Sequence, residues 1–187
     1  MTLTKPIFRK ECLKKIKNAP KHNKFYRDAA LNLKLTKELK KLKGKKILFY
    51  YSLPFEASVV KTLQKMRKNC EIYVPFMQGE SFKMVPFRLP LKQNEFCIFE
   101  AGNTLRNINN IDIAIVPAVG VDGNLQRIGF GKGMYDRFFE KLQRRPYTIF
   151  VQPVFCYTNK FICDSYDVTC DLLLTPRVRL KSKNRKN

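Results

Sequence analysis

A strongly apolar segment that leads into a cluster of glycines constrains the fold more than any other part of the chain. The segment IDIAIVPAV at 111–119 is dominated by β-branched and small residues, and five of the chain's eight glycines fall in 120–133. Such a run is typical of a strand buried on both faces of a parallel sheet. The glycines then predict a tight loop at the carboxyl end of this strand, followed by a helix over MYDRFFEKLQRR at 134–145.

Helical and β-rich segments alternate along the rest of the chain, which indicates an α/β protein. Apolar residues at helical spacing predict helices over 7–17, 24–42 and 56–69. Strands are predicted at 46–52, 71–75, 147–154 and 168–175, with weaker signals at 82–89 and 97–100. We expect a single-domain three-layer sandwich over 1–176, in which helices flank a mainly parallel sheet. The segment RVRLKSKNRKN at 177–187 lacks apolar periodicity, so a flexible basic tail is expected there.

The charge balance favours anionic partners. The 37 Lys and Arg residues outnumber the 15 Asp and Glu residues, which gives a formal net charge of +22. Such a field attracts nucleic acid, nucleotides and other phosphates. A basic RNA-binding module is therefore one hypothesis, although the chain carries no aromatic strand motif of the kind used to stack RNA bases. Small phosphorylated or polyacidic molecules are the other class of partner.

Cysteine and histidine usage argues against structural zinc. The six cysteines are dispersed without a C-x-x-C pair, and the chain has one histidine, His22. We expect six reduced and mostly buried thiols. The apolar runs are too short to span a bilayer, and the first 15 residues lack the apolar core of a signal peptide, so a cytoplasmic protein without membrane partners is expected.

The glycine-rich loop has the chemistry of an anion cradle. Glycine allows positive φ and lets a phosphate approach the backbone, while Arg127 and Lys132 supply cations. Standard nucleotide motifs do not match, because Lys132 is followed by Gly133 and the dinucleotide pattern would need glycine where Met134 stands. The spacing alone therefore leaves two interpretations open, a phosphate-binding loop of another kind and a tight turn.

Asp136 falls in the first turn of the helix predicted after the glycines. The helix dipole stabilises a carboxylate there, which is a sufficient structural reason for it. The functional alternative is a ligand for Mg²⁺ beside bound phosphates, because this cation prefers carboxylate oxygen. A second carboxylate would then come from Asp164, Asp167 or Asp171, and the spacing does not choose among the three.

The segment DIAIVPAVGVDGNLQRIGFGKGMYDRFF at 112–139 resembles the signature of the 5-formyltetrahydrofolate cyclo-ligase family, also called methenyltetrahydrofolate synthetases. Weaker similarity extends to KPIFR at 5–9, YYSLPFEASV at 50–59 and SYDVTCDLLLTP at 165–176. The resemblance implies an enzyme that converts 5-formyltetrahydrofolate to 5,10-methenyltetrahydrofolate with ATP and Mg²⁺, releasing ADP and phosphate. It would act in one-carbon metabolism on small-molecule substrates, as a monomer or weak dimer and with no obligate nucleic-acid partner.

The resemblance also implies roles for individual residues. Arg127 and Lys132 would be the catalytic cations that offset charge on the transferring phosphoryl group. Glu56 would hydrogen-bond the pterin. The remaining expectations concern three sets of residues. ATP would be bound by Lys5, Arg9, Arg127, Ile128, Gly129, Phe130, Gly131, Lys132, Gly133, Met134 and Tyr135; folate by Tyr51, Glu56, Met134 and Tyr135; and the metal by Asp136 and Asp167.

Three departures from the family signature bear on these expectations. Met134 replaces the first of two usual tyrosines and offers no hydroxyl, Val121 stands for the usual Phe before Asp122, and Ala118 stands for the usual Gly after Pro117. Weaker folate binding or a shifted substrate preference would follow. Besides the RNA-binding hypothesis, a folate-binding protein of the same fold without catalysis therefore remains an alternative.

Overall fold

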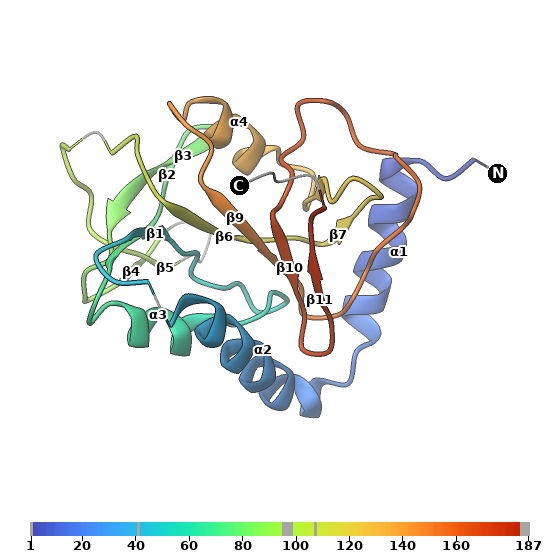
Figure 1. The fold of residues 1–187 in the computed structure, drawn as a ribbon, viewed down its shortest axis with the longest axis horizontal. Helices are drawn as coiled ribbons and strands as arrows, with labels where there is room; N and C mark the ends of the chain where they lie inside the picture. Colours follow the sequence, from blue (N-terminus) through green and yellow to red (C-terminus); the bar gives the residue numbers. More distant parts are fainter. Residues whose placement is uncertain (1, 41, 95–98, 107, 184–187) are drawn as a thin grey trace.

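The computed structural model describes residues 2–40, 42–94, 99–106 and 108–183, and these form an α/β fold around one large sheet (Figure 1). In the described part of the chain the sheet has seven strands in the order β11-β10-β9-β6-β1-β2-β3. The central strands are parallel, and β3 and β11 pair antiparallel at the two edges. The strands are β1 (Lys46–Leu48), β2 (Glu71–Gln78), β3 (Ser81–Pro86), β6 (Ile113–Pro117), β9 (Tyr147–Val151), β10 (Leu172–Leu174) and β11 (Arg179–Lys181).

Helices cover both faces of this sheet and one end of it. Helices α2 (Lys24–Leu39) and α3 (Val60–Met66) pack on one face, and α4 (Met134–Glu140) packs on the other. Helix α1 (Lys5–Asn18) lies to one side of the sheet, beyond the loops that follow its central strands (Figure 1). The predicted three-layer α/β sandwich with a mainly parallel sheet is confirmed.

Strand β6 shows why the sheet is buried on both faces. Ile113 and Ile115 point into the core beneath α2 and α3, whereas Ala114 and Val116 point into the core beneath α4. All four are at most 4% exposed. This two-sided burial is the physical reason for the continuous apolar run in the sequence, since successive side chains of a strand face opposite sides.

Several element boundaries differ from the sequence-based expectation. The predicted helix over 56–69 forms only as α3, so Glu56 lies in a turn before it. The helix predicted over 134–145 ends at Glu140. β5 (Phe99–Glu100) confirms the described part of the strand expected at 97–100, and the structure adds β4 (Lys92–Gln93), which pairs with it. The structure also adds β7 (Gly120–Val121) paired with β8 (Arg127–Ile128) and a 3-10 helix over Lys21–Asn23. Part of the strand expected at 97–100 lies outside the described residues.

The expected flexible tail is corrected over its first residues. Arg179–Lys181 forms β11 and pairs in register with β10. Arg179 also forms an ion pair with Glu38 of α2, with Nε 2.7 Å from Oε1. Strand pairing depends on a partner that is remote in sequence, so the lack of local apolar periodicity did not reveal it. Residues 184–187 lie outside the described residues.

The expectation of six reduced thiols is also corrected. Cys12 of α1 forms a disulfide with Cys156, in the loop after β9, across 144 residues of sequence. Both cysteines are almost fully buried, and they meet because α1 packs against that loop. Cys70, Cys163 and Cys170 are free thiols, and Cys97 lies outside the described residues.

No helix in the described ranges combines the length and the apolar character that crossing a bilayer would require.

Candidate active site

The glycine-rich loop begins with a small hairpin at the end of β6. Strands β7 and β8 pair antiparallel, and the chain then turns into α4 through Gly131 and Gly133. Both glycines have positive φ, at 101° and 61° respectively, which residues with a β-carbon rarely adopt. The local backbone therefore needs glycine at these two positions. This explains part of the glycine cluster before any ligand is considered.

The position of the Arg127 side chain accounts for the glycine at position 129. Its guanidinium is buried, donates from Nε to the Pro117 carbonyl at 2.9 Å, and lies over the ring of Tyr135 at 4.7 Å. A β-carbon at Gly129 would lie only 2.5 Å from Arg127 Nη1, so any other residue there would force the guanidinium to move. Burial lowers the pKa of Arg127, and the nearby carboxylate of Asp136, 3.8 Å from Nη1, opposes this effect. Arg127 is thus a cation of fixed orientation beneath the loop.

Helix α1 brings two more cations to the same loop. Arg9 donates from Nε to the Gly129 carbonyl at 2.9 Å and lies near Gly131. Lys5 forms ion pairs with Asp167 at 2.5 Å and with Asp164 at 3.4 Å. Burial opposes the charge on Lys5, but the hydrogen bond and charge of Asp167 outweigh it, so the pKa of Lys5 lies above its usual value. Lys5 therefore stays protonated at neutral pH.

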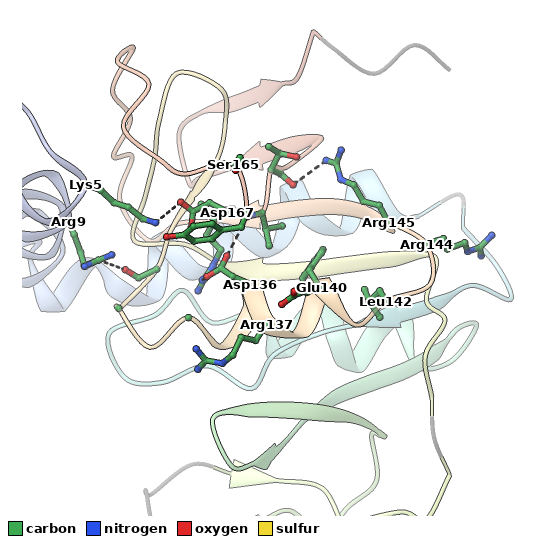
Figure 2. A pocket seen from close by; sticks show the side chains of 18 of the residues that line it. Lys5, Arg9, Asp136, Arg137, Glu140, Leu142, Arg144, Arg145, Ser165 and Asp167 are labelled. Carbon is green, nitrogen blue, oxygen red and sulfur yellow. Dashed lines mark hydrogen bonds and ion pairs between the residues drawn. The ribbon is translucent and has the colours of Figure 1, made fainter.

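These groups line a cavity of about 890 Å³. Figure 2 shows Lys5 and Arg9 reaching it from α1, while Asp136, Arg137 and Glu140 reach it from α4. The three glycines of the GFGKG turn line the same cavity. The arrangement places several cations and an exposed backbone turn around one space, which is what a polyphosphate requires.

Other residues expected to bind ATP occupy different environments. Lys132 is exposed at the tip of the loop and does not line this cavity. Ile128 is fully buried in the small core beneath α1 and does not line this cavity. Phe130 stacks at a tilt against Phe55, with 4.9 Å between ring centroids. Met134 packs on the core beneath α4.

Glu56 forms a second buried site beside the first. Its carboxylate is 7% exposed and accepts a hydrogen bond from the Leu53 N–H at 2.9 Å. Burial raises the pKa of Glu56 to about 7, against the opposing effects of that hydrogen bond and of the charge on Arg127. Burial, followed by the charge of Glu56, also raises the pKa values of Tyr50 and Tyr135. A carboxyl group and two phenols therefore share one low-dielectric region next to Arg127.

Of the two adjacent tyrosines, the structure associates Tyr50 with Glu56. The hydroxyl of Tyr50 donates to the Ala57 carbonyl at 2.5 Å, and Tyr50 is buried. Tyr51 is half-buried and contacts Phe99 edge to face, with 5.8 Å between ring centroids. Adjacent residues in extended backbone point in opposite directions, and that alternation is the signal that could have singled out Tyr50.

The candidate metal ligands are only partly free to bind a cation. Asp136 lines the cavity, and its Oδ1 accepts a long 3.4 Å bond from the Val168 N–H. Asp167 also lines the cavity, but its Oδ2 is held by Lys5 and by the Asp164 N–H. Asp171 instead accepts a hydrogen bond from the Thr148 N–H and pairs with Arg145. The described residues contain no cluster of three or more potential metal-ligating side chains.

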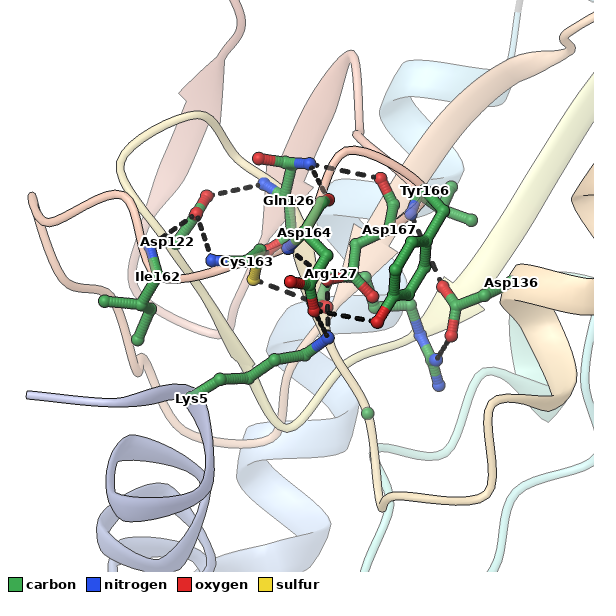
Figure 3. Close-up of polar contacts among 12 residues, drawn as sticks. Lys5, Asp122, Gln126, Arg127, Asp136, Ile162, Cys163, Asp164, Tyr166 and Asp167 are labelled. Atoms are coloured by element: carbon green, nitrogen blue, oxygen red, sulfur yellow. Dashed lines mark hydrogen bonds and ion pairs between the residues drawn. The ribbon is translucent and has the colours of Figure 1, made fainter.

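Two residues that hold the site together were not singled out from the sequence. Arg137 donates to the carbonyls of Lys132 and Glu80, which ties the loop tip to the β2–β3 turn. Asp122 is completely buried and accepts backbone N–H groups from two segments (Figure 3). The available signal was an aspartate three residues after the largely apolar run at 111–119, because a buried carboxylate requires such partners.

Known proteins with similar sequences share one description. A 5-formyltetrahydrofolate cyclo-ligase of Haemophilus influenzae is 29% identical over 127 residues, which cover 63% of this chain and 65% of that protein. One of Mycoplasma pneumoniae is 38% identical over 66 residues, or 35% of this chain and 40% of that protein. This chain thus aligns with slightly less than two thirds of the Haemophilus influenzae relative.

Solved structures show the same fold. The 5,10-methenyltetrahydrofolate synthetase of Aquifex aeolicus superposes with a TM-score of 0.80 at 24% identity, covering 99% of this chain and 96% of that one. The Mycoplasma pneumoniae 5,10-methenyltetrahydrofolate synthetase superposes with a TM-score of 0.71 at 24% identity, covering 94% and 100%. The model of the 5-formyltetrahydrofolate cyclo-ligase family matches residues 2–179. The chain therefore belongs to the 5-formyltetrahydrofolate cyclo-ligase family.

Proposed function

We propose that this protein catalyses the ATP- and Mg²⁺-dependent cyclisation of 5-formyltetrahydrofolate to 5,10-methenyltetrahydrofolate, with release of ADP and phosphate. The observation that carries the proposal is the meeting of Lys5, Arg9 and Arg127 around the glycine turn in a member of this family. Two of these cations come from α1 and the third from β8, more than 100 residues later. Such convergence supports a polyphosphate site in addition to the turn-forming role of the glycines.

In the first step, the formyl oxygen takes the γ-phosphoryl group of ATP and ADP leaves. Phosphoryl transfer depends mainly on positioning and on stabilising negative charge. Arg127 supplies a fixed guanidinium, because its contacts with Pro117 and Tyr135 prevent it from turning away. Lys5 and Arg9 supply further charge from α1. Lys132, exposed on a four-carbon stem, is the mobile cation that can approach the transferring group.

In the second step, N10 of the folate attacks the activated formyl carbon, the nitrogen loses its proton and phosphate leaves. Glu56 is suited to hold the pterin here, because a carboxyl group with a pKa of about 7 can donate or accept a hydrogen bond near neutral pH. Tyr135 belongs to this region and places its ring against the Arg127 guanidinium. Met134 and the Tyr50–Tyr51 segment are the other groups assigned to folate.

The carboxylates fit a Mg²⁺ ion that is bound mainly by the phosphates of ATP. This ion commonly keeps several waters and takes one or two protein carboxylates besides phosphate oxygens. Asp136 lines the phosphate cavity and has only a long hydrogen bond and a distant guanidinium at its oxygens. Asp167 would contribute the oxygen that Lys5 does not occupy. When bound, the metal would neutralise charge that develops between the β- and γ-phosphates.

A coupled assay tests this function directly. Purified protein is mixed with 5-formyltetrahydrofolate, ATP and Mg²⁺, and the methenyl chromophore and ADP are followed together. We expect both products in equal amounts, and none when ATP is omitted. Lys132→Ala and Asp136→Ala should each lower turnover by about 10²–10³, the usual cost of removing a group that stabilises transition-state charge. Lys10→Ala, an exposed lysine of α1, is the control and should retain full activity.

Two other outcomes would identify the alternative functions. Folate-dependent stabilisation without release of ADP would indicate a non-catalytic folate-binding protein. Tight RNA binding that survives ~0.2 M salt, without turnover, would indicate the RNA-binding module.

The proposal further includes a cytoplasmic location and a monomer or weak dimer that needs no nucleic-acid partner. Gel filtration of the active protein tests the oligomeric state.

A further inference from the structure

Asp122 is a buried carboxylate that the proposed chemistry does not use. Its side chain is fully buried, and each of its two oxygens serves a different segment of the chain. Oδ1 accepts the N–H groups of Asn124 and Gln126, both at 3.0 Å. Oδ2 accepts the N–H groups of Ile162 and Cys163, both at 3.2 Å (Figure 3). The carboxylate therefore fastens the loop that leads into Arg127 to a segment about 40 residues away.

The second segment continues into a turn that carries two acidic residues. The Asp164 N–H donates to Asp167 Oδ2 at 2.8 Å, and the Asp167 N–H donates to the Asp164 carbonyl at 3.0 Å. Gln126, which Asp122 holds, donates from Nε2 to the same Asp164 carbonyl at 2.6 Å. The turn is thus fixed twice to the loop that Asp122 organises, once through Cys163 and once through Gln126.

The turn at 164–167 also binds the ammonium group of Lys5. The Asp167 side chain is 3% exposed, and its Oδ2, which receives the Asp164 N–H, also receives Lys5 Nζ at 2.5 Å. The Arg127 N–H donates to the Val168 carbonyl at 2.7 Å, directly after the turn. The two cations Lys5 and Arg127 are therefore both attached to the segment that Asp122 holds. Figure 3 shows the continuous set of contacts from Asp122 to Lys5.

We propose that Asp122 is a positioning residue for the nucleotide phosphates: its carboxylate fixes the turn at 164–167 and thereby sets where the Lys5 ammonium stands relative to Arg127. This inference rests on the proposed function for the identity of the ligand. It predicts that weakening the clamp lowers affinity for ATP while leaving the folate site, which is built from the segment around Glu56, largely unaffected.

The first experiment compares Asp122→Asn with the wild type. Asparagine replaces one acceptor oxygen by an NH₂ group that faces two N–H donors, so one side of the clamp is lost. We expect the KM for ATP to rise about tenfold, as for loss of one or two buried hydrogen bonds, with the KM for 5-formyltetrahydrofolate within about twofold. Glu38→Gln is the control. Glu38 of α2 pairs with Arg179 of β11, with Nε 2.7 Å from Oε1, and neither residue lines the phosphate cavity, so its loss should change stability without changing the KM for ATP.

A double-mutant cycle separates positioning from a general loss of stability. If Asp122 acts through Lys5, the effects of Asp122→Asn and Lys5→Ala on ATP affinity should be clearly less than additive. Fully additive effects, or an unchanged KM for ATP in the folded Asp122→Asn protein, would overturn the proposal. Should Asp122→Asn fail to fold, Gln126→Met keeps the Gln126 N–H on Asp122 but removes the side-chain donor to the Asp164 and Asp167 carbonyls and the contact with Asn124. It should shift the KM for ATP in the same direction by a smaller factor, and no shift there also refutes the proposal.

Titration of ATP without folate distinguishes this inference from the proposed function. A wild-type protein that binds ATP but does not cyclise the folate would refute the proposed activity, while weaker ATP binding by Asp122→Asn would still support the clamp. A wild-type protein that cyclises the folate, together with an Asp122→Asn variant of unchanged ATP affinity, would refute the clamp and leave the activity standing.

Discussion

The guanidinium of Arg127 lies against the α-carbon of Gly129, two residues further along the chain. A β-carbon on Gly129 would come within 2.5–2.8 Å of three guanidinium atoms. This contact is possible because the side chain of Arg127 is held beneath its own loop by the Pro117 carbonyl and the face of Tyr135. Gly129 thus leaves room for the guanidinium of Arg127, which lines the cavity that we propose binds phosphate.

The first prediction follows from this contact. In Gly129→Ala the added methyl group should displace the Arg127 guanidinium, and with it the contacts that the guanidinium makes with Pro117 and Tyr135. We expect kcat/KM for ATP to fall by about 10²-fold, comparable to removal of a charge-stabilising group. Steady-state kinetics check this. Gly102→Ala is the control, since nothing lies within 4 Å of a β-carbon there, and its kinetics should match the wild type.

The second prediction concerns the ion pair between α1 and the acidic turn. Lys5→Ala removes a cation from the phosphate cavity and leaves the buried Asp167 carboxylate without its partner. We expect the KM for ATP to rise about 10- to 100-fold and the free energy of unfolding to fall by about 1–3 kcal/mol. Kinetics and urea unfolding measure the two effects. Unchanged ATP kinetics in the Lys5→Ala protein would show that Lys5 does not contribute to the ATP site.

The third prediction is a pH dependence of stability caused by Glu56. Its pKa is about 7 in the folded protein and near 4.5 in the unfolded chain, so the folded state binds more protons between these values. Stability from this group is therefore greatest below pH 4.5 and declines as the pH rises to about 7. Glu56→Gln should abolish this decline and raise the free energy of unfolding at pH 8 by up to about 3 kcal/mol. Parallel unfolding curves from pH 5 to 8 for both proteins would contradict the assignment.

The fourth prediction concerns the disulfide that anchors α1. A bridge across 144 residues restricts the unfolded chain strongly, and removing a native disulfide commonly costs about 2–5 kcal/mol. Reduction with a dithiol, or the double substitution Cys12→Ala/Cys156→Ala, should lower the thermal midpoint and also raise the KM for ATP, because α1 carries Lys5 and Arg9. The reductant should have no further effect on the double variant. Cys70→Ala, which leaves the bridge intact, should keep its sensitivity to the reductant.

The fifth prediction tests strand β11. Truncation after Thr175 removes β11 and uncovers the edge of β10, whose three residues are fully buried. It should lower the thermal midpoint substantially and promote aggregation, since an exposed apolar strand edge pairs readily with other chains. Truncation after Lys183 retains β11 and should leave the midpoint unchanged. Equal midpoints for the two truncated proteins would show that the strand does not contribute to stability.

Local sequence patterns predicted those helices and strands whose type and burial depend on their own residues. The run at 111–119 indicated a strand buried on both faces, and β6 confirms it. The pattern of α2 was ambiguous, because Phe25 and Leu33 shared helical spacing with Leu31 and Leu35. In the structure the second pair is fully buried, while Phe25 is 64% and Leu33 75% exposed. A helical repeat alone does not say which of two stripes meets the sheet.

The sequence by itself determined the buried strand, the glycine turn and which cations and carboxylates are available. The reason is that a strand buried on both faces requires apolar residues and a positive φ favours glycine, so both features can be read from the residue types. Only the tertiary structure decided which of these groups meet. Lys5 reaches Asp167, Cys12 reaches Cys156, and Asp122 joins two loops, in each case across about 40 to more than 160 residues. Such contacts arise when separate elements pack on a common sheet, and no local spacing in the chain encodes them.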